Sequence, residues 1–561
     1  MKKLFCGIMA IGMAAMMTAC GSSGSAPATT AAPAQPAAEA AKAPEAKAEE
    51  KAESKVEEKA ETKAAETEAA KEAAPEAGGK TGGVLKAYLP GDLSSLDYFG
   101  DRVNQELGIY ERILIKDAEG NYHGMLVDSF ESDKDAMTYT FHMFDQPIKF
   151  HDGSELTSEV FAWNINEYIQ NGYFKASLKN VDNAEAVDDK TFVLHMKEWD
   201  TFIPNYLTRM VYVISKDFVD KNGWEALKEQ TCGTGPFKLK AWNRGESIET
   251  ERFDDYRRGT PKLDGIEYHI YSAPEVAVMA LQNGELDILD FNKVSYSFLE
   301  ELAANPDVTI YEATRGGTAY TLGFNCNNPD EPISDVRVRE AICHAIDTDA
   351  IGQVLTEGYY FKGSHQWSVN EYAYCSDKVT GFEYDPALAK KLLEEAGYAN
   401  GFSTTLKVQA AYEDAAVLVQ QFLAEVGITC EVESLDRANF DKFIGGWDSG
   451  MLIHTVGVAN GQEYQIINSA RSDVTNGFGS GSFVHSPELD ELCEKAAHGT
   501  LEESYENVKQ IAETMFQNDI SMYTLALSKG IMTARTDVKD AGICGDGSRN
   551  IADLHMAWLD R

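Results

Sequence analysis

The sequence contains no closely spaced cysteine pair. Of its 9 cysteines, those beyond residue 20 are odd in number and never spaced as CxxC: Cys232, Cys326, Cys343, Cys375, Cys430, Cys493 and Cys544. A zinc site uses ligands at short spacings, and a complete disulfide framework uses an even number of cysteines. The pattern therefore argues against both. Cys343, in the apolar stretch "EAICHAID", is expected to be a buried free thiol.

Signatures of catalysis are missing as well. The chain has no GxSxG, no HExxH and no cysteine with an evident histidine partner. The stretch "GTGP" at residues 233–236 lacks the Lys-Ser/Thr of a phosphate loop and leads into a strand pattern, so we interpret it as a turn. We expect a protein that is not an enzyme, with no catalytic residue, no metal ligand and no cofactor. A secreted hydrolase is the alternative, and it would need a triad or a carboxylate pair.

The stretch "KFHDGSELTSEV" (149–160) places a histidine beside an aspartate. Both residue types bind metals and move protons, but no HxxxH, HxxE or DxD partner lies close by in the sequence. We therefore interpret the stretch as scaffold. A strand would end at Phe150, Asp152 and Gly153 would form a turn, and Thr157 would cap a helix.

Basic residues are scarce relative to acidic ones. The chain has 50 Lys and Arg against 90 Asp and Glu, which gives a formal net charge of −40. This charge excludes nucleic acid, or an anionic membrane surface, as the partner of the whole folded body. After the first twenty residues there is no apolar run long enough to cross a bilayer, so we expect no membrane-spanning helix.

Residues 1–20 resemble a bacterial lipoprotein signal. Lys2 and Lys3 provide a positive start, a short apolar segment follows, and small residues precede Cys20. In such a signal the cysteine is lipidated and becomes the mature N-terminus. An ordinary secretion signal cleaved nearby is the alternative. Both predict export, and a lipid on Cys20 would hold the chain on the outer face of the cytoplasmic membrane without spanning it.

Large apolar residues are almost absent from residues 21–80, which consist mainly of Ala, Glu, Lys, Pro and Ser. Such a segment cannot bury enough apolar surface to offset the entropy lost on ordering. We predict a disordered tether, with transient helix, that lifts a domain away from the membrane. A coiled coil is the alternative, but the segment has no apolar a/d positions.

The folded part, from residue 81, begins with strand patterns. Residues 84–89 read as a short buried strand, and residues 139–143 and 192–196 alternate apolar and polar side chains with a period of two. Strands dominate up to about residue 275. The length of this part favours two or three sub-domains.

Helices and strands alternate in the second half of the chain. Asp335 and Asp385 stand at N-cap positions before apolar stripes of helical spacing, and Pro386 occupies the first helical position. A helix over about 413–426 lies between two strand patterns. This alternation predicts an α/β lobe.

Five motifs follow one another along the chain: "KFHDGSELTSEV" (149–160), "GTGPFKLKAWNRGESIETERFDDY" (233–256), "ALQNGELDI" (280–288), "FNCNNPDEPISDVRVREAICHAID" (324–347) and "YDPALAKKLLEEAGYANGF" (384–402). Together they resemble solute-binding protein family 5 of ABC importers, the extracytoplasmic binders of oligopeptides, dipeptides and nickel. The resemblance covers about residues 81–561.

The resemblance implies an α/β fold of the two-lobed periplasmic-binding-protein type (type II, with an extra inserted sub-domain) and a ligand cleft between the lobes. Closure of the lobes would enclose the ligand. The implied boundaries are 81–97, 229–320 and 530–561 for lobe I, 98–228 for the inserted sub-domain II, and 321–529 for lobe III.

Peptide-binding relatives carry an aspartate that pairs with the α-ammonium group of the ligand. Here the corresponding position falls at about Gly457, and the nearest polar residues are Asn460, Gln462 and Glu463. Either Glu463 takes this role after a register shift, or the ligand has no amino terminus to hold. The candidate ligand-binding residues are Tyr98, Arg102, Thr318, Tyr320, Trp367, Trp447, Asn460, Glu463 and Tyr464. For Trp367, Trp447 and Tyr464, core packing is the alternative.

The function implied is that of a monomeric, lipid-anchored receptor. It would capture a solute and deliver it to the permease subunits of an ABC importer with cytoplasmic ATPases. An oligopeptide or dipeptide is the first choice of ligand. An oligosaccharide comes next because the ammonium-binding aspartate is missing, and nickel or a metal chelate is third, based on His454. A sensing or adhesion lipoprotein with the same fold is a further alternative.

Overall fold

The computed structural model describes residues 79–561 except for 102, 104–106, 118–119, 291–293, 315, 363–374, 459–462, 475–477 and 544–550. The described residues belong to one compact unit, 77–561. The predicted signal and most of the predicted tether fall outside the described residues. No helix within the described part of the chain is long and apolar enough to cross a membrane.

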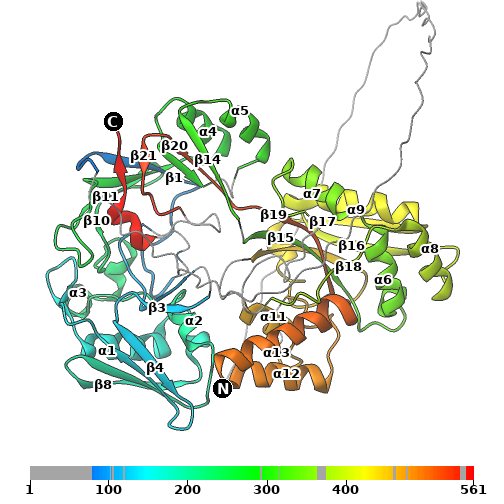
Figure 1. The fold of residues 1–561 in the computed structure, drawn as a ribbon, viewed down its shortest axis with the longest axis horizontal. Helices are drawn as coiled ribbons and strands as arrows, with labels where there is room; N and C mark the ends of the chain where they lie inside the picture. Colours follow the sequence, from blue (N-terminus) through cyan, green and yellow to red (C-terminus); the bar gives the residue numbers. More distant parts are fainter. Residues whose placement is uncertain are drawn as a thin grey trace, which may run out of the picture. The chain divides into compact units, whose positions relative to one another are not determined.

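A seven-stranded sheet gathers strands from both ends of the described chain (Figure 1). Its central strand, β1, forms where the sequence predicts a strand and pairs in parallel with β12. In sheet order the strands are β10 (Phe237–Asn243), β11 (Ser247–Arg252), β12 (Gly265–Ile270), β1 (Val84–Leu89), β13 (Ile288–Asp290), β20 (Ile531–Arg535) and β14 (Val308–Glu312). Helices α4 (Pro274–Gln282) and α5 (Leu299–Ala303) share a buried apolar cluster with this sheet.

A five-stranded sheet forms in the second half of the chain, where the sequence predicts α/β alternation. In order its strands are β17 (Ile428–Leu435), β16 (Phe402–Gln409), β18 (Met451–Val458), β15 (Gly317–Phe324) and β19 (Met522–Ser528). The accompanying helices are α6 (Val336–Ala345), α7 (Thr348–Thr356), α8 (Pro386–Glu395), α9 (Glu413–Glu425), α10 (Arg437–Phe440), α11 (Glu463–Ala470), α12 (Pro487–His498) and α13 (Leu501–Glu513).

A four-stranded antiparallel sheet contains the two strands predicted from period-two alternation. Its order is β4 (Ser129–Asp133), β5 (Thr138–His142), β9 (Thr191–Met196) and β8 (Val181–Asp188). Phe141 and Phe192 stack across β5 and β9 with ring centroids 4.8 Å apart, and Phe161 of α1 (Ser158–Asn171) stacks on Phe192 at 4.7 Å. The alternation therefore directs one face of the sheet onto a helix. Helices α2 (Ile203–Leu207) and α3 (Lys216–Asn222) follow.

The remaining strands of the described chain form two-stranded pairs: β2 (Leu114–Lys116) with β3 (Tyr122–Gly124), β6 (Ile148–Lys149) with β7 (Glu155–Leu156), and β21 (Val538–Lys539) with β22 (Trp558–Leu559). The boundaries expected between lobes and inserted sub-domain stay predictions.

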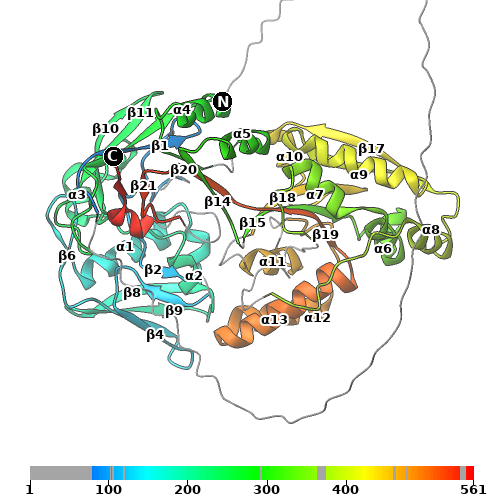
Figure 2. The same ribbon diagram turned by 45° about the horizontal axis from the view of Figure 1, so that its top comes forward.

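The chain passes from the seven-stranded to the five-stranded sheet between Glu312 and Gly317, and it returns between Ser528 and Ile531 (Figures 1 and 2). The two passages approach each other so closely that a Cβ on Gly317 would lie 1.8 Å from the carbonyl oxygen of Ser528. The φ of Gly317 is 141°, a conformation that residues with side chains rarely adopt. Glycine is therefore required at this junction.

Hydrogen bonds and one ion pair tie the two passages together. The backbone N–H of Ala313 donates to the carbonyl of Gly530 at 2.8 Å. Lys529 Nζ lies 2.8 Å from Glu312 Oε2. The five-stranded sheet and the seven-stranded sheet are thus connected by neighbouring segments, which is the geometry of a hinge.

Helix caps form as the sequence predicts. The side chain of Asp335 accepts from Arg337 N–H before α6, and that of Asp385 accepts from the first backbone amides of α8, with Pro386 at the first helical position. Thr157 caps α1 by accepting from Val160 N–H. Such caps satisfy amides that have no partner within the helix. Cys343 is free and fully buried, as expected.

The "KFHDG" and "GTGP" stretches, far apart in sequence, pack against each other. His151 Nε2 lies 2.9 Å from the carbonyl oxygen of Gly235, and His151 Nδ1 accepts from Gly233 N–H at 3.4 Å. A neutral imidazole with its proton on Nε2 satisfies both contacts. Asp152 accepts from Ser215 Oγ, and Gly153 turns the chain with a φ of 87°. The stretch is scaffold in this structure.

We predict that His151 makes folding stability depend on pH. Burial lowers its pKa from 6.5 to about 4. Between these two pH values the imidazole is protonated in the unfolded chain but not in the folded chain. The free energy of unfolding therefore includes the full contribution of the neutral ring above pH 6.5, and this contribution is lost as the pH falls towards 4. In denaturant unfolding, the free energy of unfolding of His151→Gln should fall less steeply over this pH range than that of wild type, and ligand binding should be intact.

The control for this experiment is His142→Gln, because the His142 side chain is 46% exposed. It should keep the wild-type pH dependence. If the free energy of unfolding of His151→Gln changed with pH in parallel with that of wild type, His151 would not be the source of the pH dependence.

Candidate functional site

A buried ion pair joins two distant parts of the chain. Lys116, at the end of β2, places Nζ 3.1 Å from Oε1 of Glu463, the first residue of α11. The Lys116 side chain is 5% exposed and the Glu463 side chain 0%. The residues are 347 positions apart in sequence. A desolvated pair of this kind needs good geometry to persist, and it holds the β2–β3 hairpin against α11.

Tyrosine rings surround the ammonium group. Lys116 Nζ lies 4.8 Å from the ring centre of Tyr122, on β3, and 5.6 Å from that of Tyr505, on α13. These distances allow cation–π attraction. Beside Glu463, the ring of Tyr464 meets that of Tyr206 edge-on, with centroids 6.2 Å apart. We call Lys116, Glu463, Tyr122, Tyr505 and Tyr464 the polar cluster.

Among the described residues, unsatisfied oxygens of the cluster include the hydroxyl of Tyr122 and a carboxylate oxygen of Glu463. Glu463 Oε2 is buried and has no hydrogen-bond partner among the described residues. Buried polar atoms are normally satisfied, and an unsatisfied acceptor costs about 1–3 kcal/mol. The cluster can therefore accept one more hydrogen bond at this oxygen.

The electrostatics of the cluster reflect burial. Burial lowers the pKa of Lys116; the carboxylate of Glu463 opposes this shift, and the positive charge of Arg209 adds to it. Burial, followed by the charge of Glu463, raises the pKa of Tyr122 well above its ordinary value. Burial likewise raises the pKa of Tyr505, so both rings that face Lys116 are neutral phenols at physiological pH.

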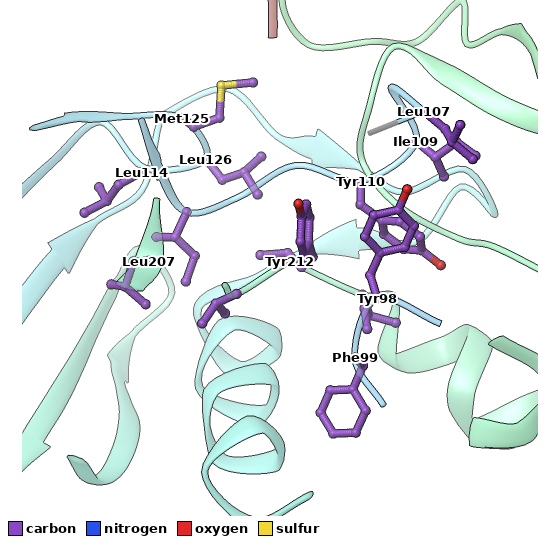
Figure 3. Packing of buried hydrophobic residues seen from close by; sticks show 14 of the residues in the cluster. Tyr98, Phe99, Leu107, Ile109, Tyr110, Leu114, Met125, Leu126, Leu207 and Tyr212 are labelled. Atoms are coloured by element: carbon purple, nitrogen blue, oxygen red, sulfur yellow. The ribbon is translucent and has the colours of Figure 1, made fainter. Parts of the chain in front are cut away.

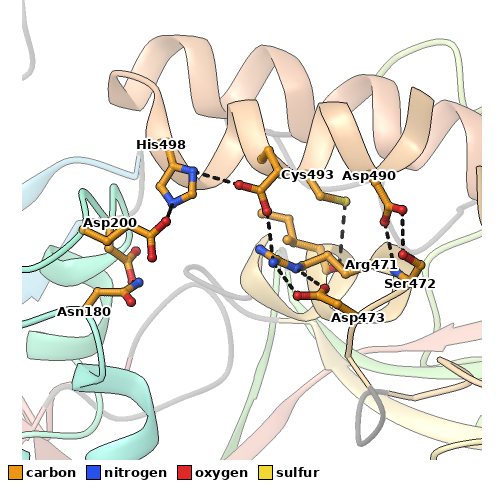
Figure 4. Close-up of polar contacts among 11 residues, drawn as sticks. Asn180, Asp200, Arg471, Ser472, Asp473, Asp490, Cys493 and His498 are labelled. Atoms are coloured by element: carbon orange, nitrogen blue, oxygen red, sulfur yellow. Dashed lines mark hydrogen bonds and ion pairs between the residues drawn. The ribbon is translucent and has the colours of Figure 1, made fainter. Parts of the chain in front are cut away.

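A second polar contact joins the segment after β9 to the turn between α12 and α13. The Thr201 hydroxyl and Trp199 Nε1 both donate to the carbonyl of Gly499, at 2.6 and 3.2 Å. The adjacent His498, shown in Figure 4, places Nε2 3.6 Å from a carboxylate oxygen of Glu198. Helices α11 to α13 therefore contact the first half of the chain at two places.

Two of the sequence-predicted ligand residues lie in cores. Tyr98 is 3% exposed, and its ring centre lies 5.0 Å from that of Tyr110 and 4.9 Å from that of Tyr212 (Figure 3). Trp447 is 5% exposed, and its Nε1 donates to the carbonyl of Gly450. Packing accounts for both positions in this structure.

The other described candidates lie on β15 and α11. Thr318 and Tyr320 are partly buried on β15, and burial raises the pKa of Tyr320 to about 12. Glu463 and Tyr464 belong to the polar cluster. Four of the predicted residues lie outside the described part: Cys20, Arg102, Trp367 and Asn460. Contact of any candidate with a ligand stays a prediction.

Sequence reasoning missed Lys116, Tyr122 and Tyr505. None stands in a motif; Lys116 and Tyr122 lie more than three hundred positions before Glu463, and Tyr505 lies farther on, in α13. In the structure Lys116 and Tyr122 pair in register across the β2–β3 hairpin, and this pairing indicates a hairpin without indicating a site.

Among the described residues, no group of three or more His, Cys, Asp and Glu side chains could hold a metal ion. His454, on which the nickel alternative rests, lies between the rings of Phe440 and Phe478, and burial lowers its pKa to about 4. A surface hollow of about 440 Å³ lies on the β4–β5 hairpin and shares no residue with the polar cluster.

Comparison with known families gives one match that covers more than half of the chain. Residues 121–477 match the family described as "Bacterial extracellular solute-binding proteins, family 5 Middle". Proteins of this family bind solutes and are not catalytic, which confirms the expectation that the chain is not an enzyme.

Curated relatives are similar over about two thirds of their length. The chain is 29% identical over 355 residues to the glutathione-binding protein GsiB of Pectobacterium atrosepticum, which covers 61% of this chain and 67% of the relative. It is 27% identical over 377 residues to a putative ABC transporter peptide-binding protein of Brucella ovis, with 64% and 69% covered.

Solved structures of low sequence identity share the fold. The substrate-binding protein CtaP of Listeria monocytogenes superposes with a TM-score of 0.74 at 22% identity, covering 86% of this chain and 100% of that one. The periplasmic binding protein DppA of Helicobacter pylori, solved with the peptide STSA, gives 0.66 at 22% identity, covering 86% and 99%. The predicted α/β periplasmic-binding-protein fold is confirmed.

We predict that breaking the buried pair on one side is costlier than removing both charges. Glu463→Gln leaves Lys116 buried without its counter-ion and should lower the free energy of unfolding by about 3 kcal/mol. The double variant Lys116→Met with Glu463→Gln should lose less, because no charge stays buried. Denaturant unfolding of wild type, both single variants and the double variant measures this coupling.

A surface pair provides the control. Lys240 and Glu249 lie 2.9 Å apart with side chains 58% and 27% exposed, so Lys240→Met should change stability by less than about 1 kcal/mol. Equal losses for Lys116→Met and Lys240→Met would show that the buried pair is not coupled.

Proposed function

The chain belongs to the bacterial extracellular solute-binding proteins of family 5, and we propose that it is the peptide receptor of an ABC importer, anchored by a lipid on Cys20. It captures an oligopeptide or dipeptide outside the cytoplasmic membrane and delivers it to the permease subunits. Cytoplasmic ATPases drive the transfer. The protein itself contributes recognition and a change of conformation.

The observation that carries this proposal is the polar cluster at the contact between the β2–β3 hairpin and α11. Lys116 precedes the first passage, and Glu463 lies between the two passages, so the cluster joins the parts of the chain on either side of them. Closure of two lobes would depend on contacts of this kind. A ligand that contacts both sides favours the closed arrangement, because its binding energy differs between open and closed forms. Glu463, Tyr464, Thr318 and Tyr320 are the described residues we propose as ligand contacts.

The named ligands of relatives support a peptide. GsiB is a glutathione-binding protein, the Brucella ovis relative is a putative peptide-binding protein, and DppA of Helicobacter pylori was solved with a tetrapeptide. An oligosaccharide is the second candidate, because tyrosine rings line the cluster and such rings stack on sugars.

We predict that short peptides stabilise the purified protein against heat. A ligand that binds only the folded state raises the unfolding free energy by about 2.7 kcal/mol when present at a hundred times its Kd. A thermal-shift screen with peptides, neutral oligosaccharides and nickel salts measures the effect. A shift with oligosaccharides alone would replace the peptide assignment, and the absence of any shift would remove the support for a transport receptor.

We predict that Cys20 carries the lipid. Metabolic labelling with an alkyne-bearing fatty acid should label the wild-type protein, and Cys20→Ala should abolish labelling because the acyl acceptor is gone. Cys6→Ala is the matched control, since residue 6 lies within the predicted signal and should leave labelling unchanged. Labelled Cys20→Ala protein would contradict the anchor.

A further inference from the structure

The polar cluster contains a positive charge of its own. Lys116 occupies the position beside Glu463 Oε1, at 3.1 Å, and is almost completely removed from solvent. The carboxylate of Glu463 therefore has an ammonium partner before any ligand arrives. We propose that Lys116 is a specificity-determining residue: the end of the ligand that faces this pair carries an uncharged N–H or O–H donor and not an ammonium group. This inference rests on the proposed receptor function and deepens it.

Charge balance disfavours a second cation here. Glu463 supplies one negative charge at the pair, and Lys116 neutralises it. Arg209 already acts on Lys116 with the same sign of charge. Of the nearby carboxylates, Asp117 accepts from Asn121 N–H and lies 2.7 Å from His123 Nε2, so it is engaged elsewhere. A ligand ammonium brought to this buried place would be repelled by Lys116, and the carboxylate of Asp117 already has partners of its own.

A neutral donor fits the unsatisfied acceptor of the cluster. Glu463 Oε2 is buried and finds no donor among the described residues. Lys116 satisfies the charge of the carboxylate through Oε1, so Oε2 needs a hydrogen bond but no further positive charge. An amide N–H of a blocked or internal peptide unit supplies such a donor, and so does a sugar hydroxyl.

The surroundings are consistent with an uncharged ligand end. The rings of Tyr122 and Tyr505 face the ammonium of Lys116, and the ring of Tyr206 packs edge-on against that of Tyr464, the residue after Glu463. These rings give apolar surface with hydroxyl groups at the edge, which suits amides and sugars. Their cation–π capacity is directed at Lys116 itself.

The test compares three probes on the mature full-length protein in detergent solution by native mass spectrometry. The probes are lysine-free short peptides with free N-termini, the same peptides after N-acetylation, and neutral oligosaccharides. Wild type should bind the acetylated peptides at least as tightly as the free ones. Lys116→Met exposes an unneutralised carboxylate, so it should prefer the free peptides by about tenfold.

Two further variants separate this effect from loss of structure. Lys116→Arg keeps the positive charge and should keep the wild-type preference. The double variant Lys116→Met with Glu463→Gln has no carboxylate to neutralise, so the preference for free peptides seen in Lys116→Met should disappear. The wild-type measurement needs no variant and tests the inference by itself.

Each possible result supports or overturns a specific part of the proposal. A wild-type preference for free N-termini would overturn the inference while leaving the peptide receptor in place. Binding of oligosaccharides alone would overturn the peptide assignment and support the neutral donor. Binding of none of the probes would overturn both. An unchanged preference in well-folded Lys116→Met would show that Lys116 does not set specificity.

Discussion

Two neighbouring chain segments join the two large sheets, and the close contact between these segments constrains how the sheets are connected. At Gly317 the backbone comes so close to the Ser528 carbonyl that no side chain fits, and the Ala313–Gly530 hydrogen bond holds the neighbouring segments in register. Because the two passages lie side by side, the two sheets are connected at a single place, as in proteins that move about a hinge.

Contacts between the parts of the chain on either side of these passages contribute to the free energy of separating those parts. Both side chains of the Lys116–Glu463 pair are buried, so separating the pair exposes two charges to water and removes the attraction between them. The difference between these two free-energy terms is small compared with either term. The contacts of Thr201 and Trp199 with the Gly499 carbonyl add hydrogen bonds to the same side of the balance.

Local signals in the sequence were informative where local physics decides the outcome. Asp335 and Asp385 cap helices, and period-two alternation forms β5 and β9, because a cap or a pleated face needs only its near neighbours. The motif around His151 makes the structural contacts that its interpretation as scaffold predicts. Its partner, the carbonyl of Gly235, could not be named from sequence, since 84 residues intervene.

Periodicity and capping residues were enough to predict strands β1, β5 and β9 and helices α6 and α8, and the resemblance carried by five ordered motifs predicted the family. The contacts of Glu463 depend on tertiary packing alone. From the sequence, Glu463 was an acidic residue available to a ligand ammonium; in the fold, Lys116, 347 positions away, forms an ion pair with it. A buried charge is satisfied by whatever the fold brings within about 3 Å, and that depends on long-range packing that no local pattern encodes.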